Sequence, residues 1–291
     1  EEMPRQTIPP TAFVSEPGED AKLGEMKRDG RMDFTRQHCA KCHLPEGGFG
    51  ANAMPETGEI APLLIGIGDR VTGDWLEKWI ADPKAMKHGT NMPNLIDPAT
   101  PEGIQQAADL AAFLSASTLG GEPLAPTDPS LAKAGGVVFH ELGCVACHDT
   151  PDAAVDPSRV PLNNVASKYR PGHLAEFLKK PEAYHPFTAM PNFKLSGEEA
   201  ASLAAFLTQA AEGKDTKMDF VFPEGDATRG ATVAESLQCG TCHAGLPGAV
   251  SNAPPLEAVF KADWAAKGCV AESDKRPQLP QMNLAEGERE S

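Results

Sequence analysis

The sequence predicts an all-α protein built of three consecutive small helical domains that are joined by Pro/Gly-rich linkers. Three observations predict this class. The motif C-x-x-C-H occurs three times in 291 residues, with its first cysteine at Cys39, Cys144 and Cys239. Apolar residues recur at helical spacing around the copies. Proline and glycine number 27 each, which suits short helices separated by many loops.

Composition narrows the class of protein further. The chain is 41% hydrophobic and 23% charged, which is typical of folded proteins. Small domains have thin cores and usually depend on a cofactor, metal or disulfide. The net charge of −15 argues against nucleic acid as a partner. That acidity suits a basic protein partner, or it only keeps the chain soluble. Because the chain starts at Glu1 without a signal peptide, we expect a processed or excised segment.

The spacing inside the motif favours covalent attachment of haem. Two thiols separated by two residues can add to the two vinyl groups of haem, and the following histidine can bind its iron. A lone C-x-x-C could also be a redox dithiol or half a zinc site. Neither the βαβ pattern of such dithiols nor a second ligand pair at short range is present. We therefore expect three covalently attached haem c groups, held by Cys39, Cys42, Cys144, Cys147, Cys239 and Cys242, with iron bound by His43, His148 and His243.

Further features recur around each motif. The segments 30–34, 135–139 and 230–234 precede the first cysteine in one register, with Ala234 where the first two segments have phenylalanine. A Pro-Leu pair and a second helical pattern follow each motif. With these features each repeat resembles a class I cytochrome c domain, and together the repeats resemble the tandem multidomain c-type cytochromes. The resemblance covers residues 21–291.

The resemblance implies a proline carbonyl that accepts a hydrogen bond from each iron-binding imidazole. Such a bond fixes the tautomer and raises the basicity of the ligand. We assign it to Pro62, Pro161 and Pro254, with a plain turn as the alternative for each. The middle helix of the first repeat carries Trp75 and Trp79, which share one face at a spacing of four residues and are expected to line a haem.

The resemblance also implies a methionine as the distal iron ligand, just before the last helix of each domain. Met92 and Met190 both stand in the sequence Met-Pro-Asn ahead of a helical pattern. In the second repeat this helix is expected to start at Ser196, with Glu199 completing a capping box. Ligation by histidine and methionine raises the reduction potential relative to two histidines.

Other residues leave alternatives open. His88 and His185 could replace the methionines as ligands, although we expect both at the surface. In the third repeat Met282 is the best candidate ligand, but it lacks the Met-Pro-Asn context and lies three residues late. An open or differently ligated third haem is therefore a second possibility. Cys269 could bind that iron as a thiolate or pair with another chain, and we expect it to be an unpaired packing residue.

The order of these features predicts the domain boundaries. Residues 116–130 and 211–228 have the composition of linkers. The last helix of the third domain is expected to be incomplete. The expected parts are an extended leader and three cytochrome c-like domains: 1–20, 21–118, 128–212 and 224–291.

The sequence predicts electron transfer between redox partners outside the cytoplasm. Iron with histidine and methionine ligands has no open position for a substrate, so we expect an electron carrier rather than an enzyme. The alternative is a haem enzyme, peroxidase-like or oxidising sulfur compounds, that uses an unusual third site. Expected partners are a protein donor and acceptor, or a larger membrane or multi-subunit complex. We expect a periplasmic or other extracytoplasmic protein, and membrane association through segments or partners outside this chain is left open.

Overall fold

A computed structural model gives the structure of most of the chain. Within that part, the regular elements are helices, accompanied by two isolated β-bridges. The prediction of an all-α fold is confirmed, whereas the arrangement in three consecutive domains stays a prediction. None of the described helices is both long and apolar enough to span a bilayer. The described residues are 17–36, 39, 61–90, 92–151, 153, 156, 158–186, 188–247, 258 and 261.

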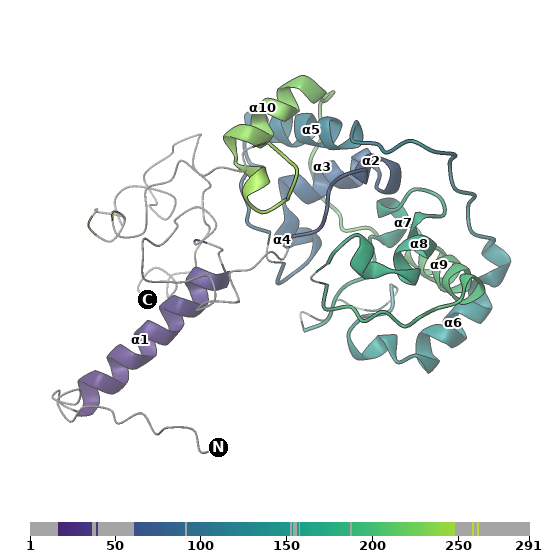
Figure 1. Ribbon diagram of the computed structural model, residues 1–291, viewed down its shortest axis with the longest axis horizontal. Helices are drawn as coiled ribbons and strands as arrows, with labels where there is room; N and C mark the ends of the chain where they lie inside the picture. Colours follow the sequence, from purple (N-terminus) through teal and green to yellow (C-terminus); the bar gives the residue numbers. More distant parts are fainter. Residues whose placement is uncertain are drawn as a thin grey trace, which may run out of the picture.

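Helix α1 (Pro17–Arg36) lies apart from the other labelled helices in Figure 1. Its start corrects one prediction, because residues 17–20 of the expected extended leader are helical. Proline suits the first helical position, where its fixed φ fits and its missing N–H has no intrahelical partner to lose. The rest of that leader lies outside the described residues.

Residues 132–211 form a helical unit with its own core, called the central unit. Helix α6 packs along α9, and the fully buried ring of Phe139 lies 5.4 Å from the ring of Phe206. Helix α9 starts with the predicted capping box, in which Ser196 and Glu199 each accept a bond from the other's backbone N–H. Its elements are α6 (Ala132–Glu141), η6 (Cys144–Ala146), α7 (Val165–Lys168), α8 (His173–Lys179), η7 (Pro181–Ala183) and α9 (Gly197–Ala211), preceded by η5 (Pro129–Leu131).

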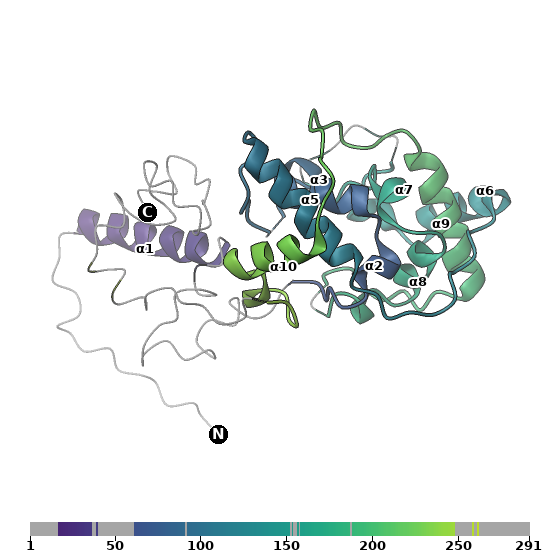
Figure 2. The same cartoon turned by 90° about the horizontal axis from the view of Figure 1, so that it is seen from above.

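A second core joins two distant parts of the chain. Ala234 of α10 and Leu237, which follows the end of that helix, are buried in one cluster with Leu110 and Leu114 of α5. Figures 1 and 2 both show α10 lying along α5. We call residues 61–118 together with 218–247 the composite unit. Its elements are α2 (Ile67–Arg70), α3 (Gly73–Ala81), α4 (Pro83–Met86), α5 (Pro101–Ser115), α10 (Ala227–Ser236) and η8 (Cys239–Thr241). From the sequence, residues 61–118 and 224–247 are expected in separate first and third domains, and residues 218–223 in the linker between the second and third.

An ion pair between the buried Asp109 and the exposed guanidinium of Arg229 joins α10 to α5. The carboxylate of Asp109 is 3% exposed and accepts bonds from Arg229 Nε at 2.8 Å and Arg229 Nη2 at 2.7 Å. It also accepts a bond from the backbone N–H of Asp226 at 2.8 Å. These bonds, that from Arg229 above all, hold the pKa of Asp109 below its ordinary value. A buried carboxylate needs such partners, because an unpaired charge is costly away from water.

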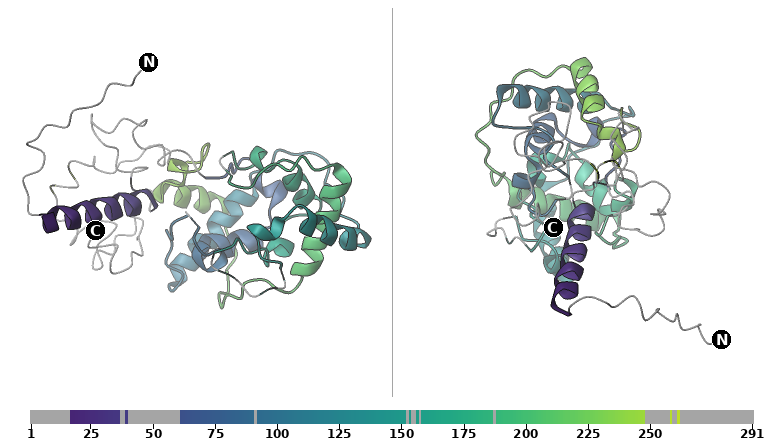
Figure 3. Two further views of the ribbon diagram at one scale, coloured as in Figure 1. Left: turned by 90° about the horizontal axis from the view of Figure 1, so that it is seen from below. Right: turned by 90° about the vertical axis from the view of Figure 1, so that its left-hand side faces the viewer.

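The predicted linker 211–228 packs against both units instead of spanning freely between them. Asn164 of the central unit accepts a bond from the backbone N–H of Thr216 at 2.8 Å. Further along, Met218, Phe220 and Phe222 pack against the core of the composite unit. The segment thereby returns the chain from α9 to α10, as the views in Figure 3 also show.

The two units also contact each other directly. The backbone N–H of Leu63 donates to the carbonyl of Tyr184 at 2.9 Å, and that of Thr72 donates to the carbonyl of Lys168 at 3.0 Å. The ammonium of Lys168 lies 4.6 Å from the ring centroid of Trp75 and 5.0 Å from that of Tyr169. Burial lowers the pKa of Lys168 to about 8. A partly buried lysine therefore sits between aromatic rings where the units meet.

Candidate haem-binding sites

The second and third C-x-x-C-H motifs form the same backbone turn. In the second, the backbone N–H of His148 donates to the carbonyl of Cys144 at 3.0 Å, and in the third that of His243 donates to Cys239 at 2.9 Å. The two cysteines and the histidine of each motif therefore follow one helical turn. This turn is the arrangement expected if two thiols are to reach one edge of a porphyrin while the imidazole reaches its iron.

Each turn follows a residue in the left-handed conformation. Gly143 has φ of 71° at the end of α6, and Gln238 has φ of 55° at the end of α10. Glycine adopts this conformation without steric penalty, but glutamine does not. The same chain reversal is thus kept in the third motif despite an unfavourable residue, which indicates that the surrounding packing holds it.

Both imidazoles are oriented by a backbone carbonyl. Nδ1 of His148 lies 3.2 Å from the carbonyl oxygen of Val160, and Nδ1 of His243 lies 3.1 Å from that of Pro62. A carbonyl can only accept, so Nδ1 carries the proton and Nε2 keeps its lone pair. Burial lowers the pKa of both histidines, which favours the neutral form that binds metals.

These bonds differ from the predicted ones. For the second motif we expected the carbonyl of Pro161, but the acceptor is Val160, one residue earlier. The reason is a parallel bridge in which the backbone N–H of Val160 donates to the carbonyl of Cys147 at 2.9 Å. Proline has no N–H for that bond. Pro62 does hold an imidazole, but it is the one from the third motif. The predicted partners His43 and Pro254 lie outside the described residues.

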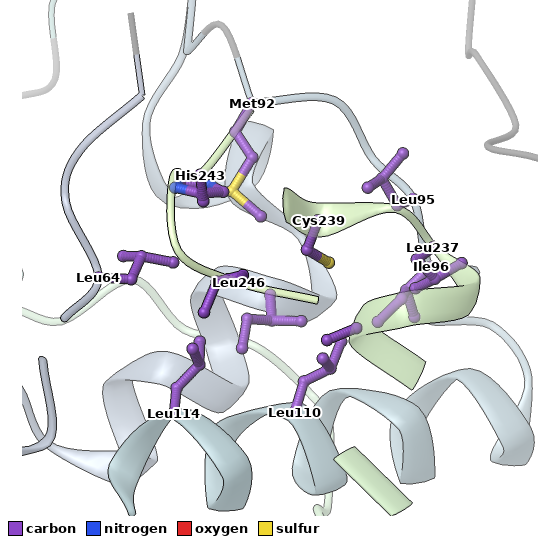
Figure 4. A pocket seen from close by; sticks show the side chains of 12 residues that line it. Leu64, Met92, Leu95, Ile96, Leu110, Leu114, Leu237, Cys239, His243 and Leu246 are labelled. Atoms are coloured by element: carbon purple, nitrogen blue, oxygen red, sulfur yellow. The ribbon is translucent and has the colours of Figure 1, made fainter. Parts of the chain in front are cut away.

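An apolar pocket of the composite unit brings predicted ligands together (Figure 4). Met92, Cys239 and His243 line it among leucine, isoleucine and alanine side chains. The cavity itself has a volume of about 40 Å³. Trp79 Nε1 donates to the sulfur of Met92 at 3.0 Å, so the thioether is held at the pocket.

The loops that carry the two predicted methionine ligands have the same local structure. The hydroxyl of Thr90 accepts a bond from the backbone N–H of Met92 at 3.3 Å, and that of Thr188 does so for Met190 at 3.1 Å. Met190 and Cys144 both pack against the core of the central unit. The role of Thr90 and Thr188 was not predicted. Both stand two residues before the methionine of a Met-Pro-Asn, and that shared spacing could have pointed to it.

The donor set fits haem better than the alternatives considered from the sequence. Burial raises the pKa of the Cys144 thiol, and it raises that of Cys239 to about 11. A redox-active dithiol needs a lowered thiol pKa, so these cysteines do not fit that role. An apolar lining with a thiol, a thioether and a neutral imidazole matches the side chains that would hold a haem and its iron. Within the described stretches, no group of three or more His, Cys, Asp and Glu is arranged to hold a metal ion.

The central unit decides the family of this part of the chain. Residues 132–211 match the family model for cytochrome c. The match supports a cytochrome c domain over these residues, and with it covalently bound haem c and haem-based electron transfer. The match lies inside the predicted second domain, 128–212, and includes Cys144, His148 and Met190. No curated protein and no solved structure matches the chain.

The remaining predicted residues lie as follows. Trp75 and Trp79 stack with ring centroids 5.1 Å apart, and their expected contact with a haem stays a prediction. His88 is exposed, whereas His185 is partly buried, and the charge of His185 contributes to the lowered pKa of His243. Cys39 is partly buried. Outside the described residues lie Cys42, His43, Pro254, Cys269 and Met282.

Proposed function

We propose that this chain transfers electrons through three covalently attached haem c groups between redox partners outside the cytoplasm. One observation carries the proposal. In the described residues, a C-x-x-C-H turn with a carbonyl-held imidazole occurs twice, each time in a unit that also contains a threonine-anchored methionine loop. The remaining copy of the motif, which begins at Cys39, supports a third haem site by its sequence.

Haem supplies a one-electron couple at each site, and the residues of the chain set its properties. The carbonyl bonds to Nδ1 hold His148 and His243 in the tautomer that leaves Nε2 for iron. A thioether on the opposite side raises the reduction potential. The apolar side chains around the sites keep water out, which also tunes the potential. Histidine and methionine would together leave no position on the iron for a substrate, which supports electron passage over substrate turnover.

The charge supports a proposal about partners and place. A net charge of −15 favours association with a basic protein surface, with an on-rate that falls as salt is added. Such a partner could be a soluble redox protein or part of a larger membrane or multi-subunit complex. We place this chain in the periplasm or a comparable extracytoplasmic compartment.

Counting and titrating the haems tests the proposal. Intact mass and haem staining of the matured protein should show three covalent haems, and two or fewer would contradict the count. A spectropotentiometric titration should then resolve three one-electron steps. Carbon monoxide added to the reduced protein tests the enzyme alternative. If one haem binds it and peroxide is also turned over, the chain is an enzyme and the carrier proposal is wrong.

A further inference from the structure

The third C-x-x-C-H turn meets ligand residues of the first repeat. His243 Nδ1 lies 3.1 Å from the carbonyl oxygen of Pro62, and His243 and Cys239 line one pocket with Met92. The whole central unit separates these segments in the sequence. Resting on the proposed haem function, we infer that the haem attached at the third motif takes Met92 as its distal ligand, so that one haem domain is assembled from residues 61–118 and 218–247.

The helix crossing in the composite unit repeats that of the cytochrome c domain. A Cβ atom on Gly135 of α6 would lie 1.9 Å from the carbonyl oxygen of Ser202 on α9. A Cβ atom on Gly230 of α10 would lie 2.0 Å from that of Asp109 on α5. Both glycines stand nine residues before the first cysteine of their motif. Helix α10 therefore takes the place against α5 that α6 takes against α9.

Charge selects α10 over α1 as the partner of α5. Arg229, just before Gly230, makes two bonds to the buried carboxylate of Asp109. In the same register before the first motif, Gly30 is preceded by Asp29. If α1 docked on α5 in this way, Asp29 would face Asp109, and two carboxylates in a buried contact repel each other. The ion pair thus favours the pairing of the third motif with the first repeat's last helix.

Met92 has the Met-Pro-Asn context that Met282, the candidate ligand of the third repeat, lacks. Met92 stands in the same loop type as Met190 of the cytochrome c domain, with a threonine hydroxyl bonded to its backbone N–H. Trp79 Nε1 directs the sulfur of Met92 by a 3.0 Å bond. Leu64, Leu110 and Leu114 supply apolar walls from the first repeat. Proximal and distal ligands of one site therefore come from different repeats.

Removal of single haems tests the assignment. One protein carries Cys39→Ala and Cys42→Ala, and the other carries Cys239→Ala and Cys242→Ala. Met92→Ala is then added to each, and the thioether-to-iron charge-transfer band of the oxidised protein is measured. We expect Met92→Ala to remove one band from the first protein and none from the second. Loss of a band only from the second protein, or from neither, would overturn the inference.

A charge swap tests the same pairing without removing a haem. Arg229→Asp and Asp109→Arg should each lower the temperature at which the Met92-dependent band is lost, and the double variant should restore it. If the double variant is no better than either single variant, α10 does not pair with α5. The Met190-dependent band of the same samples is the internal control and should not change.

The two proposals fail separately. A wild-type mass with fewer than three haems would contradict the haem count, while the Met92 test would still report on the haem at the third motif. Three haems, with the Met92 band following the haem at Cys39 and Cys42, would leave electron transfer intact and refute the composite site alone.

Discussion

Replacing Gly230 by alanine should break the composite unit at its closest helix contact. The new Cβ atom would lie 2.0 Å from the carbonyl oxygen of Asp109 and 2.7 Å from Cβ of Phe113. Real Cβ contacts essentially never fall below 3.0 Å, so α10 and α5 must separate by about 1 Å. Both close neighbours are backbone or backbone-proximal atoms, so no side-chain rotation relieves the clash.

The loss of stability follows from the packing contacts that are lost when α10 and α5 separate. A gap of about 1 Å forfeits a quarter to a half of the dispersion energy of the atoms that face it. The facing atoms include those of Ala234 in α10 and of Leu237 just after it, both in the buried core. Overpacking of this kind costs about 3 kcal/mol. For a unit of this size, the loss corresponds to a fall in Tm of about 10 °C or more.

Thermal unfolding and hydrogen exchange measure the effect. Gly230→Ala should speed exchange in peptides of α5 and α10 while leaving α6 and α9 protected. In Gly135→Ala the new Cβ atom would lie 1.9 Å from the carbonyl oxygen of Ser202. This variant should speed exchange in peptides of α6 and α9 and leave α5 and α10 protected. Gly197→Ala is the matched control, because its Cβ atom would have nothing within 4 Å. Wild-type exchange in α5 peptides of Gly230→Ala would refute the reasoning, since it would mean that α10 does not lie there.

Three further predictions concern other charges and ligands. The bonds from Arg229 lower the pKa of Asp109. The Asp109 carboxylate therefore stabilises the fold above about pH 4, and this stabilisation is lost as the pH falls through the lowered pKa. Asp109→Asn should reduce the free energy of unfolding at neutral pH and leave it close to the wild-type value in acid. The pKa of Lys168 is lowered from 10.5 to about 8, so its charge opposes folding below about pH 8. Between about pH 8 and pH 10.5 the free energy of unfolding of the wild type should rise by at most about 3 kcal/mol, because the folded protein loses this charge first. Lys168→Met should not show this rise. Met190→Ala should abolish the charge-transfer band of the cytochrome c domain and lower one potential, and an unchanged oxidised spectrum would exclude Met190 as a ligand.

Local features of the sites could be read from the sequence. The C-x-x-C-H spacing predicts a thiol pair and an imidazole on one turn, and the turns at Cys144 and Cys239 have that form. The capping box of Ser196 and Glu199 was also predictable, because both partners lie within one helical turn. The resemblance also implied a backbone carbonyl acceptor for each imidazole, but the acceptor for His148 is Val160 and Pro62 holds His243.

Local sequence patterns did not predict which carbonyl accepts the bond from His148. The Pro-Leu pair lies within one residue of the true acceptor. The backbone bond from Val160 to Cys147 determines which carbonyl faces the ring of His148. The bridge depends on how two loops meet, and one residue of register moves the acceptor. Propensity and spacing do not fix such a register, because the competing positions differ only in long-range packing.

The sequence by itself determined the chemistry of this protein: the repeated motif, the methionine loops, the helical class and the acidic charge. Only the tertiary structure places the third motif beside Met92 and Pro62 of the first repeat. The ion pair between Asp109 and Arg229 joins residues 120 positions apart, and the contact of Gly230 with α5 is equally distant. Repeats with the same local pattern can exchange partners without changing any local preference. Their pairing is therefore chosen by close backbone approach and buried charge, which exist only once the helices have met.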